Sequence, residues 1–562
     1  HVREQGIVDI PEYEIKKKDV KTEEDRLIRA VRLAQRQVRR LQSRAKEMAN
    51  GAGEELWALL DAYLLMLDGS RLVRGAQTRI GKQRINAEAA IQMEISHISE
   101  AFQAMGDPYI AARLDDIREV GNRILLNLGK HPLRPLSAFP KGSIVIAENL
   151  SPADMAQMDP TCVSGTGTLL GGAEGHTAIM ARALGIPSVL GAVGLLDGVR
   201  SGDMVIIDGS AGLVVVNPNV ETLKRFERRR SEIDKVSKRL ARLKTLPAIT
   251  RDGTEIRLQA NIELPIEMAL VEQVAAQGVG LLRSEFMFMN RQSLPSEDEQ
   301  FSVMRQIVEG MNGAPVTIRS LDVGADKASK AVIGEMDDSV TTALGVRGIR
   351  LSLLKPELLE IQFRAMLRAS NYGPVRILLP MVSTVKEVQQ ARKFLELAAA
   401  KLRRKKIKIP TILPPLGTMI EVPGAALAAD ALAQVSDFLA IGSNDLTMYT
   451  LAIDRANEHV AGLFDTLHPA VLRLIQFTTG AAMKARIPIS ICGEMAGDPK
   501  LTALLVGLGL RELSMSPANI PRVKQRILEM DAVAASNRAN LIMDQVDSGR
   551  IRMLLEDFNS LS

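Results

Sequence analysis

The chain has 562 residues, of which 46% are hydrophobic and 24% charged, a composition typical of a globular protein. Its net charge is only +5, and the 3% of aromatic residues argues against a surface that binds nucleic acid by base stacking. Two isolated cysteines and no long apolar run argue against structural zinc, disulfides and membrane spans, so a reducing, cytoplasmic location fits.

The sequence pattern predicts an edge strand and a loop over residues 1–20, followed by an inserted helical bundle over residues 21–131. From Thr22 onward, apolar residues recur at helical spacing. They are Leu27, Ile28, Val31, Leu33, Ala34, Val38 and Leu41. Further helical blocks are expected at 54–68, 84–105 and 108–128. Since the sequence begins at His1 rather than methionine, we expect it to be a fragment of a longer protein.

Residues 132–218 have the short apolar runs of an α/β domain, which residues 1–20 are expected to complete. Strands are predicted at 142–147, 189–190, 204–208 and 213–217, with a helix over 176–184. A charged helix over 220–243, within a linker at 219–250, is a plausible arm between domains.

From residue 251 to residue 562, strand-like and helical segments alternate, which predicts a (β/α)8 barrel. The expected strands are 255–262, 279–283, 316–321, 376–381, 416–421, 437–442, 489–493 and 512–516. Most are apolar, as strands buried on both faces are. Polar residues follow where the runs end, and a barrel gathers those ends on its catalytic face. They include Arg283, Glu285, Arg319, Asp322, Glu421, Asn444, Asp445, Cys492 and Glu494.

His176 follows two glycines and begins a predicted helix, a place where backbone N–H groups attract phosphate. Neutral imidazole is a competent nucleophile, so His176 could carry a phosphoryl group. Spacing alone favours the simpler interpretation that His176 is a cap or turn residue. The stretch Gly165–Gly171 looks like a phosphate loop but fits neither common pattern.

Motifs along the rest of the chain favour the phosphoryl-carrying interpretation of His176 over the structural one. The stretch from Gly171 to Arg182 resembles the phosphohistidine signature of phosphoenolpyruvate-utilising enzymes. The barrel adds further similar segments: 280–286, 319–327, 344–350, 419–423, 441–447, 454–455 and 491–498. Together they resemble enzyme I of the bacterial phosphotransferase system, the phosphoenolpyruvate–protein phosphotransferase family. Glu174 and Gly175 depart from the family, which usually has a hydroxyl residue two positions before the histidine.

The resemblance implies a role for each matching residue. His176 would take the phosphoryl group and Cys492 would donate a proton to the enolate. Glu421 and Asp445 would bind Mg²⁺. The substrate contacts would come from Arg283 and Arg319 on the phosphate, from Asn444 with Arg455, and from Lys327 and Arg347 as further anion contacts.

The resemblance also implies the reaction and the partners. Phosphoenolpyruvate would phosphorylate His176, which would pass the group to a histidine of a small phosphocarrier protein, HPr or its nitrogen-branch counterpart, and pyruvate would leave. The helical insertion would dock that carrier, and the barrel would form a homodimer. The start at His1 and the Glu174–Gly175 pair favour the nitrogen branch.

Two other interpretations remain open. A fragment of pyruvate phosphate dikinase or phosphoenolpyruvate synthase would need a nucleotide-binding domain, which the sequence does not contain. A non-catalytic, phosphoenolpyruvate-sensing regulator would be expected to lack metal or arginine residues, yet all of them are present.

Overall fold

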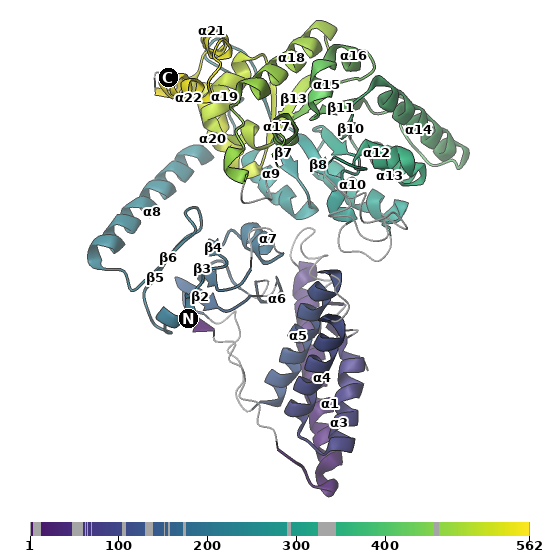
Figure 1. Cartoon of the computed structure of the whole chain (residues 1–562), viewed down its shortest axis with the longest axis vertical. Helices are drawn as coiled ribbons and strands as arrows, with labels where there is room; N and C mark the ends of the chain where they lie inside the picture. The colour runs from purple at the N-terminus through teal and green to yellow at the C-terminus, as the bar shows by residue number, and fades with distance from the viewer. Residues whose placement is uncertain are drawn as a thin grey trace. The chain divides into compact units, whose positions relative to one another are not determined.

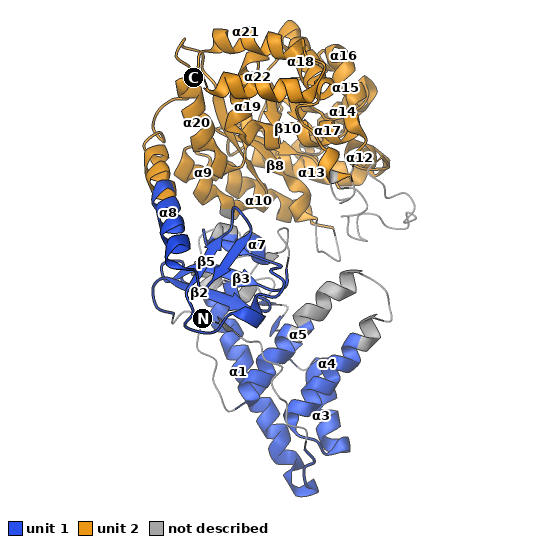
Figure 2. Ribbon diagram, turned by 60° about the vertical axis from the view of Figure 1, so that its left-hand side comes forward, with its two compact units in different colours: residues 1–232 blue, residues 233–562 orange. Residues whose placement is uncertain are grey.

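The structure is a computed structural model of the chain (Figure 1). It describes residues 2–3, 13–47, 60–61, 63–64, 66–68, 70–103, 108–129, 139–150, 152–155, 158–171, 176–288, 294–323, 344–453 and 460–560. The chain forms two compact units, residues 1–232 and 233–562 (Figure 2). None of the described helices is both long and apolar enough to cross a lipid bilayer.

Unit 1 contains a bundle of helices. Its described members are α1 (Val20–Glu47), α3 (Arg71–Gln83), α4 (Ala87–Gln103) and α5 (Pro108–Leu128). In α1, Leu27, Ala34 and Val38 are fully buried, which confirms the helical spacing of the sequence. Leu33 belongs to the predicted pattern but is exposed, because it lies off that buried face.

Helix α3 was not predicted from the sequence, and the predicted start of the next helix, at residue 84, is too early. Two glycines, Gly75 and Gly81, lower the helix propensity of α3, and the helix forms because Leu72, Val73, Ala76 and Ile80 bury one face. It ends at Arg84, which adopts the left-handed conformation with φ 55°. The next helix, α4, therefore begins only at Ala87.

The other part of unit 1 is a parallel sheet with the strand order β1-β2-β3-β4. Its strands are β1 (Val2–Arg3), β2 (Ser143–Ala147), β3 (Val163–Thr168) and β4 (Ser188–Val189). Two short helices, α6 (Pro152–Met155) and α7 (His176–Ala183), follow β2 and β3 in the chain, and β5 (Val205–Asp208) pairs antiparallel with β6 (Leu213–Val216). The predicted strands at 142–147, 189–190, 204–208 and 213–217 and the helix that begins at His176 are confirmed.

The glycine-rich stretch that looked like a phosphate loop is mostly a strand. Gly165 and Gly167 lie within β3, so the loop interpretation is wrong there. A Cβ at Gly165 would lie 3.3 Å from Ile207, and one at Gly167 would lie 2.9 Å from the Ile146 side chain. These glycines therefore let neighbouring side chains pack against β3.

The two units divide within α8 (Val220–Ala241), the charged helix that the sequence predicts. Just beyond α8, the backbone carbonyls of Leu243 and Lys244 accept hydrogen bonds from Lys524 Nζ, at 3.1 and 3.0 Å. This contact lies within unit 2 and fixes the start of unit 2 against its C-terminal part.

Unit 2 is a closed barrel of eight parallel strands, which confirms the predicted fold class. They are β7 (Arg257–Ile262), β8 (Val279–Arg283), β9 (Val316–Arg319), β10 (Val375–Leu379), β11 (Leu416–Ile420), β12 (Leu439–Gly442), β13 (Ile489–Cys492) and β14 (Glu512–Met515). Each overlaps one of the eight predicted runs. Because every pair is parallel, all the carboxyl ends meet at one edge of the barrel.

The described helices of unit 2 complete the fold (Figure 1). They are α9 (Met268–Val274), α10 (Glu297–Gly310), α12 (Ile349–Leu354), α13 (Pro356–Ala369), α14 (Val385–Arg404), α15 (Pro423–Leu427), α16 (Ala429–Ala433), α17 (Ser443–Leu451), α18 (Pro469–Ala485), α19 (Pro499–Gly507), α20 (Ile520–Glu529), α21 (Ala532–Met543) and α22 (Ser548–Ser560). Short turns of 3-10 helix follow β8 at Ser284–Met287 and β13 at Glu494–Gly497.

Candidate active site

The predicted polar residues of the barrel gather at its carboxyl edge. Arg283 ends β8, Arg319 ends β9 and Cys492 ends β13. Glu421 directly follows β11, and Asn444 and Asp445 lie in the first turn of α17, directly after β12. The ends of these five strands thus bring reactive side chains to the same face of unit 2.

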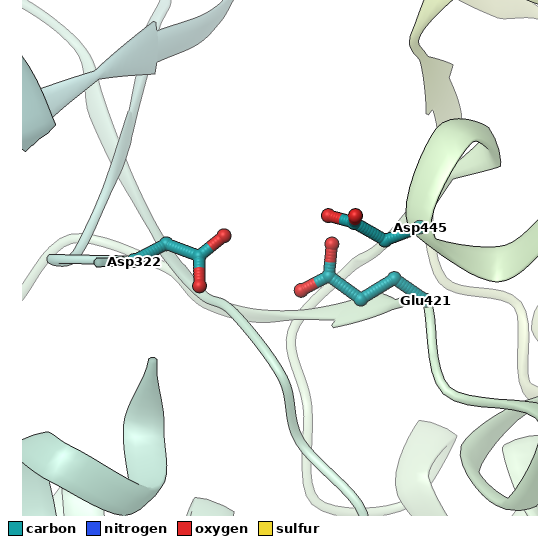
Figure 3. A group of neighbouring side chains, drawn as sticks. All are labelled: Asp322, Glu421 and Asp445. Atoms are coloured by element: carbon teal, nitrogen blue, oxygen red, sulfur yellow. The ribbon is translucent and has the colours of Figure 1, made fainter. Parts of the chain in front are cut away.

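Three carboxylates from different strand ends converge in this site. Oxygen atoms of Asp322, Glu421 and Asp445 all lie within 4.8 Å of one another (Figure 3). Such a set of oxygen donors suits a hard divalent cation such as Mg²⁺. The sequence predicted Glu421 and Asp445 as metal ligands, whereas Asp322 was noted only as a polar residue after a strand.

The mutual repulsion of these three carboxylates favours the binding of a cation between them. Burial, together with the charges of Asp322 and Asp445, raises the pKa of Glu421 well above its ordinary value. The Glu421 side chain also accepts a hydrogen bond from the backbone N–H of Met381, at 2.6 Å. A divalent cation would offset the repulsion among the three groups, so these residues fit the metal that the family implies.

Arg319 is the buried cation of the site. It pairs with Glu285 at 3.1 Å and with Asp322 at 3.2 Å. Burial lowers the pKa of Arg319, but the surrounding carboxylates outweigh it and hold the guanidinium charged. Glu285 Oε1 also accepts the backbone N–H of Asp322, at 3.0 Å, so the Glu285 carboxylate fixes both partners. From the sequence, Glu285 was noted only as a polar residue after a strand, without a role.

Arg347 joins the same network from the segment before α12. It pairs with Asp322 at 3.1 Å and lies 3.7 Å from Asp445, and it donates to Tyr449 Oη at 3.1 Å. Burial raises the pKa of Asp322, but Arg319 and Arg347 outweigh that effect and hold it below its ordinary value. Asp322 therefore remains a charged link between two arginines and the other carboxylates.

Cys492 is only 2% exposed, and its Sγ donates to the carbonyl oxygen of Ile441 at 3.5 Å. Burial raises the pKa of its thiol to about 12. A thiol with this pKa keeps its proton at neutral pH, which suits a proton donor rather than a nucleophile.

Two further predicted residues lie at the rim. Arg283 pairs with Glu263 while its side chain stays 40% exposed, so it can still turn toward an anion. Asn444 Oδ1 accepts the backbone N–H of Glu494 at 3.2 Å, which orients the amide.

The remaining predicted residues are not placed at this site. Lys327 and Arg455 lie outside the described residues, as do Glu174 and Gly175. The backbone of His176 begins α7 in unit 1, and its side chain also lies outside what the structure describes.

Three family models match this chain, and together they define its class. The phosphoenolpyruvate-binding domain of phosphoenolpyruvate-utilising enzymes matches residues 237–532, the mobile domain matches residues 139–212, and the N-terminal domain matches residues 1–113. The barrel with its arginines, carboxylates and protonated thiol is thus that of a phosphoenolpyruvate-utilising enzyme.

Curated relatives narrow this class. The phosphoenolpyruvate-protein phosphotransferase of Cupriavidus necator is 42% identical over 559 residues, covering 97% of this chain and 94% of the relative. The protein of the same name from Geobacillus stearothermophilus is 38% identical, covering 89% of this chain and 86% of the relative. The chain belongs to the phosphoenolpyruvate-protein phosphotransferase family.

Two solved structures are also similar to parts of this chain. A solution structure of an enzyme I protein is 30% identical, covering 40% of this chain and 90% of that chain, with a TM-score of 0.34. An N-terminal domain of nitrogen enzyme I is 28% identical, covering 41% and 93%, with a TM-score of 0.31.

Proposed function

We propose that this protein transfers the phosphoryl group of phosphoenolpyruvate to His176 and then to a histidine of a small phosphocarrier protein, releasing pyruvate. The observation that carries the proposal is the convergence of Arg319, three carboxylates and a protonated thiol at one barrel edge. These groups match the needs of a substrate that has a phosphate, a carboxylate and a carbon to be protonated.

The arginines would hold the substrate's negative charge. Arg283 and Arg319 would bind the phosphate in a forked geometry, and Asn444 with Arg455 would hold the rest of the substrate. Lys327 and Arg347 would add further anion contacts. The pairing of Arg319 with Glu285 and Asp322 supports this assignment, because it fixes the guanidinium in place before the substrate arrives.

Glu421 and Asp445 would hold Mg²⁺, with Asp322 close enough to take part. When bound, the cation neutralises charge on the substrate oxygens. The chain's own residues would have to hold the substrate so that its phosphorus faces the imidazole of His176, because such positioning provides much of the catalysis in phosphoryl transfer.

During the transfer, the bond from phosphorus to the enol oxygen breaks and a bond from phosphorus to the His176 imidazole forms. The enolate left behind takes the proton of Cys492 Sγ on its methylene carbon, which gives pyruvate. Water then returns a proton to the thiolate. The raised pKa of Cys492 supports this role, because the thiol holds a proton when the enolate forms.

The same proposal assigns the parts of the chain. Residues 1–20 with 132–218 would be the phosphohistidine domain, residues 21–131 would dock the carrier, and residues 219–250 would link them to the barrel at 251–562. The phosphohistidine domain would swing between the barrel and the carrier. The barrel would form a homodimer, and the carrier would be that of the nitrogen branch in the cytoplasm.

The test is incubation with labelled phosphoenolpyruvate and Mg²⁺, with wild type beside His176→Ala. We expect an acid-labile label on the wild type alone. Label on both proteins, or on neither, would contradict the proposal. Labelling by ATP without phosphoenolpyruvate would favour a dikinase-like enzyme instead.

A further inference from the structure

A hollow of about 480 Å³ lies along helix α3 of unit 1, far in sequence from the barrel site. One face of α3 and one residue of α4 line it. The lining residues are Arg71, Arg74, Gly75, Thr78, Arg79, Lys82, Gln83 and Glu94. Their spacing of three and four residues along α3 places them in a single stripe on the helix surface.

The stripe is strongly cationic. Helix α3 has the sequence RLVRGAQTRIGKQ, with four basic residues and no acidic one. All four basic residues line the hollow, and Glu94 is the acidic residue among the described residues that line it. Within the described part of the chain, no ion pair involves Arg74 or Lys82, so two of these four exposed or half-buried cations have no counter-charge there.

Glu94 forms the floor of the hollow. Its buried carboxylate pairs with Arg79 at 2.8 Å and lies 4.0 Å from Arg71. Gly75 makes room for it, because a Cβ at Gly75 would lie only 2.4 Å from Glu94 Cδ. This floor holds Arg79 in place and attracts Arg71, while Arg74 and Lys82 extend from the same stripe into solvent.

We infer that this stripe docks an acidic protein surface, and that the phosphocarrier served by this protein has carboxylates around its phosphorylated histidine. The inference rests on the proposed function, which gives the chain such a partner. The stripe from Arg71 to Lys82 is about 16 Å long, longer than a single small anion needs. Charge complementarity over this length favours a macromolecule with several carboxylates.

The experiment uses the full chain and two purified HPr-type carriers, one acidic and one basic around its histidine. The label from phosphoenolpyruvate is followed first onto the chain and then onto each carrier. We expect a KM at least about tenfold lower for the acidic carrier, rising with ionic strength as the attraction is screened. The double variant Arg71→Glu/Arg74→Glu is expected to remove this preference, with labelling of the chain itself unchanged.

A matched control is Arg228→Glu/Arg230→Glu, which makes the same change of charge on the exposed face of α8. It is expected to leave both KM values unchanged, which separates a local contact from a net-charge effect. Thermal unfolding of both variants checks that the bundle is intact.

The results of this experiment distinguish a failure of the proposed function from a failure of the inference alone. If the wild type takes no label, the proposed function fails and this inference fails with it. If the chain labels normally but prefers the basic carrier, or if the α3 variant behaves like the α8 control, only the inference is overturned. Binding of inorganic pyrophosphate that depends on Arg71 and Arg74, with an unchanged KM for the acidic carrier, would make the hollow a small-anion site and overturn it as well.

Discussion

At the scale of single residues, the site combines a fixed cation with a fixed proton. Arg319 stays charged because the surrounding carboxylates outweigh the cost of its burial, and Cys492 stays protonated because burial disfavours its thiolate. Burial therefore shifts the two pKa values in opposite directions, lowering that of Arg319 and raising that of Cys492, and the carboxylates around Arg319 reverse its effect on the guanidinium.

Cys492→Ala is expected to lower pyruvate formation from phosphoenolpyruvate by about 10²-fold or more, because the enolate loses its proton donor. Transfer of label from a phosphorylated carrier back to His176 needs no such proton and is expected to persist. Both rates are measured on the same preparation. An equal loss of the two reactions would count against Cys492 as the donor.

The raised pKa also predicts how Cys492 reacts. Because burial raises the pKa of the Cys492 thiol to about 12, the thiol keeps its proton at pH 8. Iodoacetamide is therefore expected to modify the partly exposed Cys162 first, and Cys492 only after unfolding. Mass spectrometry of peptides from native and unfolded protein measures both sites, and rapid native modification of Cys492 would contradict the burial.

The same pKa shift has a consequence for stability. The folded pKa lies above the ordinary value of 9.0, so the folded state binds the proton more tightly. This contribution is present below pH 9 and is lost as pH rises toward 12, so stability falls over that range.

At the scale of elements, α3 and β3 are two that could not be predicted from the sequence pattern. Both are rich in glycine, which lowers propensity, and both form because neighbouring elements pack closely against them. The eight barrel strands were predictable because a strand buried on both faces is a continuous apolar run. The grouping of Asp322 with Glu421 and Asp445 was not predictable by spacing, because only barrel closure brings the three together.

Two glycines of α3 give a matched pair of substitutions. Gly75→Ala would place a Cβ 2.4 Å from the buried Glu94 side chain and is expected to lower the free energy of unfolding by about 1–2 kcal/mol. Gly81→Ala meets only Glu24, at 3.7 Å, and is expected to raise it by about 0.5–1 kcal/mol through helix propensity. Denaturant unfolding of both variants measures the difference, and equal effects would show that Glu94 is free to move.

At the scale of the whole molecule, the resemblance of motifs predicted the family, while the structure describes how the barrel residues support one another. His176 and the barrel site belong to different compact units. The requirements of the reaction at the barrel site and of the reaction at His176, such as a need for metal, can therefore be measured separately.

Removal of divalent metal by EDTA is expected to stop labelling of His176 by phosphoenolpyruvate, because the three carboxylates lose their counter-charge. In the proposed function, transfer between His176 and the carrier does not use those carboxylates, so it is expected to continue. Labelling from each direction, with and without EDTA, measures this. Equal inhibition of both reactions would place a metal requirement outside the barrel.

Because Cys492 is buried, its thiol is expected to keep the hydrogen isotope of the solvent in which the enzyme was equilibrated. A thiol that is 2% exposed exchanges its hydrogen with bulk water only when the site opens. Enzyme equilibrated in H₂O and mixed rapidly with substrate in D₂O is expected to give a first pyruvate that carries protium at its new methyl position, and deuterium in later turnovers. Deuterium in the first turnover would mean that the thiol exchanges faster than the chemistry occurs.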